Sequence, residues 1–302
     1  MRVGFVSLIG RPNAGKSTLL NRIVGTKLAI VSDKPQTTRN RILAVRNYSD
    51  EVAAQVIFVD TPGIHRPLHR MNARMVDIAY ESISNVDVIG LVRDATDGLG
   101  AGDRFVLARL EQARGPVVLI LNKVDLIAKT RLLPLIDWYR QQREFAAIIP
   151  VSAETGDGVD VLEHELIRQV PEGEALYPND YLTDQPERVL AAETVREKVL
   201  RHTHAELPFT TAVVVDQFDE DSESGRLQLY CSILVERSSQ KPIVIGPGGA
   251  MIKQIGTEAR QDLERFFNTQ VYLDLHVKVR SEWRDNDRIL DQMGVSPKSH
   301  GQ

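Results

Sequence analysis

The stretch that most constrains this chain is Gly10–Thr18, with the sequence GRPNAGKST. It follows an apolar run, Val3–Ile9, and leads into a second apolar segment, Leu19–Val24. A buried strand, a glycine-rich turn and a helix in this order form a phosphate-binding loop. The glycines let backbone N–H groups point at phosphate oxygens, and the positive end of the helix adds to the attraction. The Lys16 ammonium reaches the outer phosphates, and the Ser17 hydroxyl ligates Mg²⁺. The sequence therefore predicts a nucleoside-triphosphate site made of Gly10, Arg11, Pro12, Asn13, Ala14, Gly15, Lys16, Ser17 and Thr18.

Composition and charge are those of an ordinary soluble chain. The length of 302 residues suggests two domains, and 42% hydrophobic with 26% charged residues is typical of globular proteins. The single cysteine, Cys231, excludes an internal disulfide and fits a reducing compartment. No apolar run approaches the ~20 residues of a membrane span. We therefore expect a cytoplasmic protein. The net charge of −4 is uneven, because residues 1–170 carry 22 basic and 19 acidic side chains and the remainder carries a net −7.

Two further motifs predict the groups around the γ-phosphate and its metal ion. A polar loop ends in the pair Thr37-Thr38, and one of these hydroxyls completes a Mg²⁺ shell in a P-loop protein. The sequence does not separate the two, and we take Thr38. After the apolar strand 53–59, Asp60 stands at the strand end, where its carboxylate holds Mg²⁺ through water, and the Gly63 N–H senses the γ-phosphate. The predicted metal ligands are Ser17, Thr38 and Asp60, and the predicted nucleotide-binding stretch is Asp60, Thr61, Pro62 and Gly63.

A third group of motifs predicts the base. A buried strand over 116–121 delivers Asn122-Lys123-Val124-Asp125. The Asp125 carboxylate presents two acceptors that match the N1–H and the exocyclic amine of guanine, and adenine has no such donor pair. Asn122 is placed to brace the P-loop, and the Lys123 stem lies over the ring. After the last predicted strand, Ser152, Ala153 and Glu154 let backbone N–H groups approach the base. The alternation of strands and helices predicts an α/β domain with a mostly parallel mixed sheet, and every motif lies at a strand's carboxyl end.

These motifs together resemble the translation-factor-related GTPases over roughly the first 170 residues. The resemblance implies slow GTP hydrolysis with Mg²⁺, in which Lys16, Thr38 and Gly63 act at the phosphates. Ile64 stands where Ras-like enzymes carry the glutamine that orients the attacking water. Asn13 and the double threonine resemble the residues at these positions in the potassium-activated members of these GTPases. In those members, an asparagine at this position of the P-loop holds a K⁺ that supplies positive charge near the phosphates. The alternative for Asn13 is a turn residue that tolerates unusual φ and ψ.

The second half predicts an RNA-binding domain. Residues 171–184 (PEGEALYPNDYLTD) are typical of a linker, and a helix over 186–204 with strands over 209–217 and 226–236 follows. Gly246-Pro247-Gly248-Gly249 then fits the G-x-x-G loop with which a KH domain clamps single-stranded nucleotides. A helix, which we expect Gly256 to break, and a closing strand over 271–279 complete an α+β, type II KH-like domain. The predicted RNA contacts are Gly246, Pro247, Gly248, Gly249, Ile243, Ile245, Ile252, Lys253 and Arg260. Pro247 and the net charge of −7 after residue 170 weaken the affinity for RNA that is expected of the loop itself.

A GTPase domain (1–170), a linker (171–184) and a KH-like domain (185–302) in this order resemble the Era family of bacterial GTPases over nearly the whole chain. The resemblance implies a monomeric 30S-subunit assembly factor that binds the 3′ region of 16S rRNA, not DNA. It also implies peripheral association with the inner face of the cell membrane, for which the sequence shows no anchor. The alternative is a signalling GTPase whose second domain binds a protein or a membrane surface.

Overall fold

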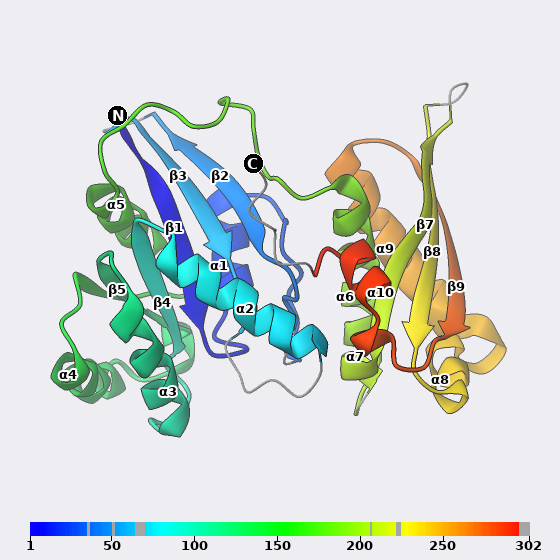
Figure 1. Ribbon diagram of the computed structural model, residues 1–302, viewed down its shortest axis with the longest axis horizontal. Coiled ribbons are helices and arrows are strands. Elements are labelled where there is room, and N and C mark those ends of the chain that lie inside the picture. Colours follow the sequence, from blue (N-terminus) through cyan, green and yellow to red (C-terminus); the bar gives the residue numbers. More distant parts are fainter. Residues whose placement is uncertain (35–36, 50–51, 64–69, 206, 222–224, 296–302) are drawn as a thin grey trace. The chain divides into compact units, whose positions relative to one another are not determined.

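The structure is a computed structural model of the chain (Figure 1), and it describes every residue except 35–36, 50–51, 64–69, 206, 222–224 and 296–302. The contacts divide the chain into two compact units. The first comprises Met1–Ala29, Thr38–Arg66 and Met75–Asp184. The second comprises Ile30–Thr37, Pro67–Arg74 and Gln185–Gln302. None of the helices in the described ranges is long and apolar enough to cross a membrane.

The first unit is built on a six-stranded sheet in the order β2-β3-β1-β4-β5-β6. Strands β2 and β3 form an antiparallel hairpin, and every other neighbouring pair is parallel, as the sequence predicts. β1 therefore lies near the middle of the sheet (Figure 1), and its carboxyl end opens between β3 and β4. The strands are β1 (Arg2–Gly10), β2 (Ile42–Tyr48), β3 (Ala54–Asp60), β4 (Val88–Asp94), β5 (Val117–Asn122) and β6 (Ala147–Pro150).

Helices cover this sheet because its strands are apolar on both faces, and β3 to β5 are buried along almost their whole length. Side chains of α2, α3 and α4 form one core with alternate residues of β4 and β5. α5 contacts β1 and β6, and α1 contacts β1, β2 and β3. The helices are α1 (Lys16–Val24), α2 (Arg70–Ser84), α3 (Ala101–Arg109), α4 (Leu132–Gln142) and α5 (Val159–Gln169).

Residues 171–184, which the sequence presents as a linker, lie along the sheet of the first unit. The Val3 N–H donates to the Pro171 carbonyl at 2.8 Å, and the Val45 N–H of edge strand β2 donates to the Leu182 carbonyl at 2.9 Å. Tyr177 and Tyr181 stack with ring centroids 4.7 Å apart and pack against the apolar side chains of β1 and β2. Backbone pairing and the two stacked tyrosines hold this segment against the first unit.

The second unit packs helices α6 and α9 against a three-stranded sheet in the order β7-β8-β9. β7 and β8 are antiparallel, whereas β8 and β9 are parallel, so the chain crosses over between them through α8 and α9. After β9, the buried Trp283 indole donates to the Thr210 carbonyl at 2.9 Å. The elements are α6 (Glu187–His202), α7 (Leu207–Thr210), β7 (Thr211–Glu220), β8 (Leu227–Val235), α8 (Lys241–Ile245), α9 (Ala250–Phe267), β9 (Val271–Val279) and α10 (Asp287–Gln292).

The break expected at Gly256 is wrong, because α9 runs through it without interruption. A Cβ at this position would lie 3.5 Å from the Leu275 Cδ1 on β9, so the glycine sits where helix and sheet pack closely. Packing on the sheet offsets the ~1 kcal/mol that glycine costs inside a helix.

Candidate nucleotide site and GPGG loop

The P-loop joins β1 to α1 at the carboxyl edge of the sheet. Gly15 precedes the helix with φ 90°, and a Cβ there would lie 2.1 Å from the Asn122 amide nitrogen, so only glycine fits. Asn13 is exposed and also has positive φ (62°), a conformation that asparagine tolerates better than most residues. The loop thus has the curved backbone that presents N–H groups to an anion.

Lys16 lies folded over this loop. Its ammonium donates to the carbonyls of Gly10 at 3.4 Å and Arg11 at 3.2 Å, and the side chain is buried. Burial lowers the pKa of Lys16, and the nearby Asp60 carboxylate acts against that shift. The amine is therefore held beside the loop, in the position from which it would meet the outer phosphates of a nucleotide.

Three oxygens converge at the start of α1. The Ser17 hydroxyl lies 2.7 Å from Asp60 Oδ2 and 2.7 Å from the Thr38 hydroxyl, which is itself 3.4 Å from the same carboxylate oxygen. Asp60 is fully buried, and its Oδ1 has no hydrogen-bond partner in the structure. Burial raises the pKa of Asp60, while Lys16 and the two hydroxyls oppose this. Hydroxyl and carboxylate oxygens with one orphaned acceptor fit the requirements of Mg²⁺.

The structure separates the two threonines that the sequence leaves undecided. The Thr38 hydroxyl takes part in the cluster with Ser17 and Asp60. The Thr37 hydroxyl instead donates to the Lys34 carbonyl at 2.6 Å. Thr38 is therefore the residue that fits a metal ligand.

Gly63 lies directly against the P-loop. A Cβ on Gly63 would come within 2.9 Å of three Pro12 atoms, so a larger residue would push the two segments apart. Thr61 is fully buried and its hydroxyl donates to the Leu8 carbonyl at 3.0 Å, which fixes the start of this segment to β1. Ile64, which the sequence analysis singled out, lies outside the described residues.

Asn122 ties the expected base-recognition loop to the P-loop. Its amide donates to the Ala14 carbonyl and its oxygen accepts from the Ala153 N–H, both at 2.9 Å. Ala153 and Glu154 are held from another side, because Arg22 of α1 donates to the carbonyl of each. Ser152 is buried, and its hydroxyl accepts from the Thr155 N–H at 3.1 Å. The motif residues 122 and 152–154 thus meet around one point of the fold.

Lys123 and Asp125 differ in their surroundings. Lys123 donates to the Asp94 carboxylate at 2.6 Å. Partial burial acts to raise the pKa of Asp94, but the hydrogen bonds from Lys123 and Thr96 outweigh it and hold the pKa below its usual value. Asp125 is exposed, with its carboxylate accessible to a base. Sequence reasoning missed both Asp94 and Arg22, since neither belongs to a phosphate- or base-binding motif.

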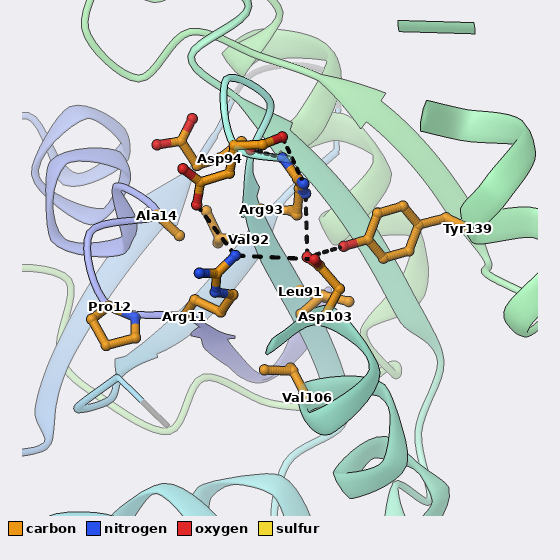
Figure 2. Close-up of a pocket in the computed structure, with 11 residues that line it drawn as sticks. Arg11, Pro12, Ala14, Leu91, Val92, Arg93, Asp94, Asp103, Val106 and Tyr139 are labelled. Carbon is orange, nitrogen blue, oxygen red and sulfur yellow. Dashed lines mark hydrogen bonds and ion pairs between the residues drawn. The ribbon is translucent and has the colours of Figure 1, made fainter. Parts of the chain in front are cut away.

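Behind the P-loop, a small cavity separates the loop from β4 and α3 (Figure 2). Its volume of about 10 Å³ is room for one water molecule and far too little for a nucleotide. This cavity is therefore not the nucleotide site, and we call this side of the loop its rear side. The charged side chains that line the cavity are Arg11, Arg93, Asp94, Asp97 and Asp103.

The G-x-x-G sequence of the second unit forms a tight turn between α8 and α9. Gly246, Gly248 and Gly249 all have positive φ, at 75°, 56° and 81°. A Cβ on Gly248 or Gly249 would meet nothing within 4 Å, so this surface is bare backbone. Pro247 is exposed at its tip. A phosphodiester chain could approach the backbone here without a side chain in its way.

The flanking residues of the predicted RNA surface divide into three groups. Ile243 has 54% of its surface exposed, and Lys253 is exposed as well. Ile245 and Ile252 are partly buried against the core of the unit, which leaves one apolar edge beside the loop. Arg260 lies elsewhere, because it is eleven positions along the helix from Gly249 at the end of the loop, or about 16 Å. Its guanidinium lies 3.9 Å from Glu264, so the structure does not place it with the loop.

Comparisons with known proteins agree with both halves. The family model described as "50S ribosome-binding GTPase" matches residues 5–123, and the model described as "KH domain" matches residues 209–284. GTPase Era of Syntrophus aciditrophicus is 49% identical over 293 residues, which cover 97% of this chain and 95% of that protein. GTPase Era of Geobacter metallireducens is 47% identical over 295 residues, with 98% of each chain covered.

Two solved structures match the whole fold. One is an Aquifex aeolicus Era variant bound to GDP and AlF₄⁻, and the other is Era in complex with MgGDPNP and nucleotides 1506–1542 of 16S ribosomal RNA. Each has a TM-score of 0.94 and 40% sequence identity, covering 98% of this chain and 100% of the matched chain. A phosphate loop, a guanine motif and a KH turn in one chain, together with relatives of this similarity along its whole length, show that the chain belongs to the Era family of GTPases.

Proposed function

We propose that this chain is a GTP-dependent switch that binds the 3′ region of 16S rRNA through its KH domain and assists 30S-subunit assembly. The observation that carries the nucleotide half is the convergence of Ser17, Thr38 and Asp60 beside the P-loop. The solved Era complexes with MgGDPNP, with GDP and AlF₄⁻ and with 16S rRNA nucleotides support the same reading. We take residues 1–170 as the GTPase domain, 171–184 as the connection and 185–302 as the KH domain.

In this proposal the side chains of the site have distinct tasks. Ser17 and Thr38 ligate Mg²⁺ directly and Asp60 holds it through water, and the ion when bound neutralises phosphate charge. The Lys16 ammonium and the P-loop N–H groups stabilise the charge that builds on the β–γ bridging and γ oxygens during hydrolysis. The Gly63 N–H, held against Pro12, contacts the γ-phosphate and loses that contact once phosphate leaves.

Potassium activation is a further part of the proposal, and it rests on Asn13. The exposed side chain stands on the phosphate loop itself, where a bound K⁺ would add positive charge near the β- and γ-phosphates. Replacing KCl by NaCl at equal ionic strength is expected to lower kcat roughly tenfold. Asn13→Gly keeps the positive φ and removes the ligand, so its slow rate should no longer depend on the cation. Equal rates in the two salts for the wild type would remove the role of Asn13.

The RNA half of the proposal is tested at Gly248 and Gly249. Replacing both by Asp introduces two carboxylates into open space, and replacing both by Asn adds side chains of nearly the same shape without charge. Both residue types tolerate positive φ, so the pair of variants isolates repulsion of phosphate. Binding of a labelled 16S 3′-end oligonucleotide should weaken at least about tenfold more in the Asp variant than in the Asn variant. Equal binding by both variants, or no binding by the wild type, would favour the signalling alternative.

The remaining parts concern where and with what the chain acts. We propose a cytoplasmic monomer that works on the 30S subunit and associates peripherally with the inner face of the cell membrane. Co-sedimentation with purified 30S subunits, with and without a non-hydrolysable GTP analogue, tests the target. The same assay with lipid vesicles in place of subunits is the comparison. Co-sedimentation with vesicles but not with 30S subunits would contradict the proposed target.

A further inference from the structure

Arg11 sends its backbone and its side chain to opposite sides of the P-loop. On the phosphate side, its carbonyl accepts from the Lys16 ammonium at 3.2 Å and from the Ala14 N–H at 3.4 Å. On the rear side, its guanidinium lies 3.3 Å from Asp97 and 4.0 Å from Asp103 (Figure 2). The position of the side chain thus bears directly on the peptide that orients Lys16.

Asp103 is a fixed anchor for this guanidinium. Its side chain is only 1% exposed, although it carries a charge. It accepts from the Gly100 N–H at 2.9 Å and from the Tyr139 hydroxyl at 2.8 Å, and the buried Arg93 lies at 3.4 Å. Burial raises the pKa of Tyr139, and the Asp103 charge raises it further, so the hydroxyl keeps the proton that it donates. A buried carboxylate with several donors has one well-defined position.

The guanidinium also fits closely onto the first turn of α3. A Cβ on Gly102 would lie 2.8 Å from Arg11 Nε and 3.1 Å from its Cζ. The glycine therefore leaves the space that the arginine fills. Any side chain at residue 102 would displace the guanidinium from Asp103.

The effect of this anchor continues forward along the loop. Pro12 follows Arg11 and is the residue against which Gly63 lies, with 2.9 Å between Pro12 atoms and a Cβ position on Gly63. A displaced Arg11 would therefore disturb two groups near the phosphates, the Lys16 ammonium and the Gly63 N–H.

We propose that Arg11 is a positioning residue for GTP hydrolysis, held between Asp97 at 3.3 Å and the buried Asp103 at 4.0 Å so that the Arg11–Pro12 peptide stays in its reactive place. The inference rests on the proposed GTPase function and adds to it a role for the rear side of the P-loop. It assigns the buried Arg93–Asp103–Tyr139 network to catalytic geometry as well as to packing. The Arg11 guanidinium lies beside Asp97 and Asp103, so the proposed role is indirect and acts through the backbone of the loop.

The main experiment is a double-mutant cycle of Arg11→Ala and Asp103→Asn in the full chain. The measured quantities are kcat and KM for GTP and the release rate of a fluorescent GDP. Preorganised groups act on the transition state, so kcat should fall roughly tenfold in each single variant while KM changes by less than about threefold. Release of GDP should be faster. The double variant should be no slower than Arg11→Ala alone, because that variant already lacks the contact with Asp103. Arg11→Lys keeps the charge and should recover part of the rate.

Gly102→Ala separates positioning from folding, in case Asp103→Asn folds poorly. Alanine favours the helix, so the unfolding temperature should not fall. The new methyl group still displaces the guanidinium, and kcat should drop about threefold. Arg104→Ala changes an exposed arginine on the same helix and should leave kcat unchanged.

Each outcome decides the inference. A wild-type rate in Arg11→Ala and Gly102→Ala, or multiplicative losses in the double variant, would overturn it while the GTPase function stood. A wild-type chain that binds no guanine nucleotide would refute the proposed function, and the inference with it. A raised KM at unchanged kcat would show that Arg11 supports binding only, which also contradicts the proposal.

Discussion

At the scale of single residues, Thr37 and Thr38 offer the sharpest test of the site. They are adjacent and identical, but only the Thr38 hydroxyl lies with Ser17 and Asp60. Thr38→Ala should lower kcat about 10²-fold through loss of a metal ligand, whereas Thr37→Ala should change it less than about threefold. Steady-state hydrolysis at saturating Mg²⁺ measures both. Equal losses would mean that the hydroxyl cluster is not the metal site.

Asp125 carries the prediction about base selectivity. Its carboxylate is exposed. We expect it to accept from the two guanine donors, and an amide at the same position to pair with xanthine instead. Asp125→Asn should therefore weaken GTP binding by about 10²-fold or more and improve XTP binding. Competition of the two nucleotides against a fluorescent GDP shows the exchange. Unchanged preference for guanine would contradict the assignment of this residue.

Residues within local motifs could be located from the sequence, and residues that support them from elsewhere could not. Asn122 and its bond to the P-loop follow from the motif alone. Asp103 and Tyr139 contact the rear of the site from two different helices, and nothing in their spacing marks them. Arg260 is near the GPGG motif in the sequence but lies about three helical turns from it along α9, so its contact with RNA stays a prediction.

At the scale of elements, the glycines of α9 and its loop should respond in opposite directions to the same substitution. Gly256→Ala adds a methyl group at an ordinary packing distance from Leu275 and should raise the free energy of unfolding by up to ~1 kcal/mol. Gly246→Ala should lower it by more than ~1 kcal/mol, because φ is 75° and the new Cβ would lie 2.6 Å from that of Met251. Urea denaturation followed by circular dichroism measures both changes. A destabilised Gly256→Ala would indicate a strained helix there.

The succession of strands and helices along the chain could be predicted, because the two have different hydrophobic periodicities. The positions of the strands within each sheet could not. The hairpin β2–β3 follows from its short connection. The helix α8 before the GPGG loop, by contrast, has a proline in its first turn and is only five residues long. A helix of this length is too short to show a helical periodicity in the sequence. Helix α9 continues through Gly256 because it packs against β9. Local helix propensity does not take such a tertiary contact into account.

At the scale of the whole molecule, the lone thiol reports on the second unit. Cys231 is fully buried in β8, and burial, with a smaller effect of Asp216, raises its pKa from 9.0 to about 12. A thiol reagent at pH 8 should therefore react only after this unit unfolds. A raised pKa stabilises the fold below pH 9.0, and that contribution is lost as pH rises toward about 12. The free energy of unfolding of Cys231→Ala should therefore fall less steeply with pH over that range than that of the wild type. Rapid labelling of the native wild-type chain by the thiol reagent would contradict the burial of Cys231.

A second prediction at this scale concerns the C-terminal boundary of the first unit. A fragment ending at residue 184 should be more soluble and more thermostable than one ending at 170. The longer fragment keeps the pairing of Val45 with Leu182 and the stacked tyrosines 177 and 181, which cover edge strand β2. Light scattering and thermal unfolding of the two fragments with GDP compare them. Equal behaviour would show that the covering segment contributes nothing.

The same arrangement has a consequence for synthesis on the ribosome. β1 is made first, but it pairs with β3 and β4, and its first residues also pair with residues 171–173. The phosphate loop therefore leaves the exit tunnel early, but β1 completes its pairing only after β3, β4 and residues 171–173 have also emerged. Translation of the RNA-binding half has therefore already begun when the first unit completes its own fold.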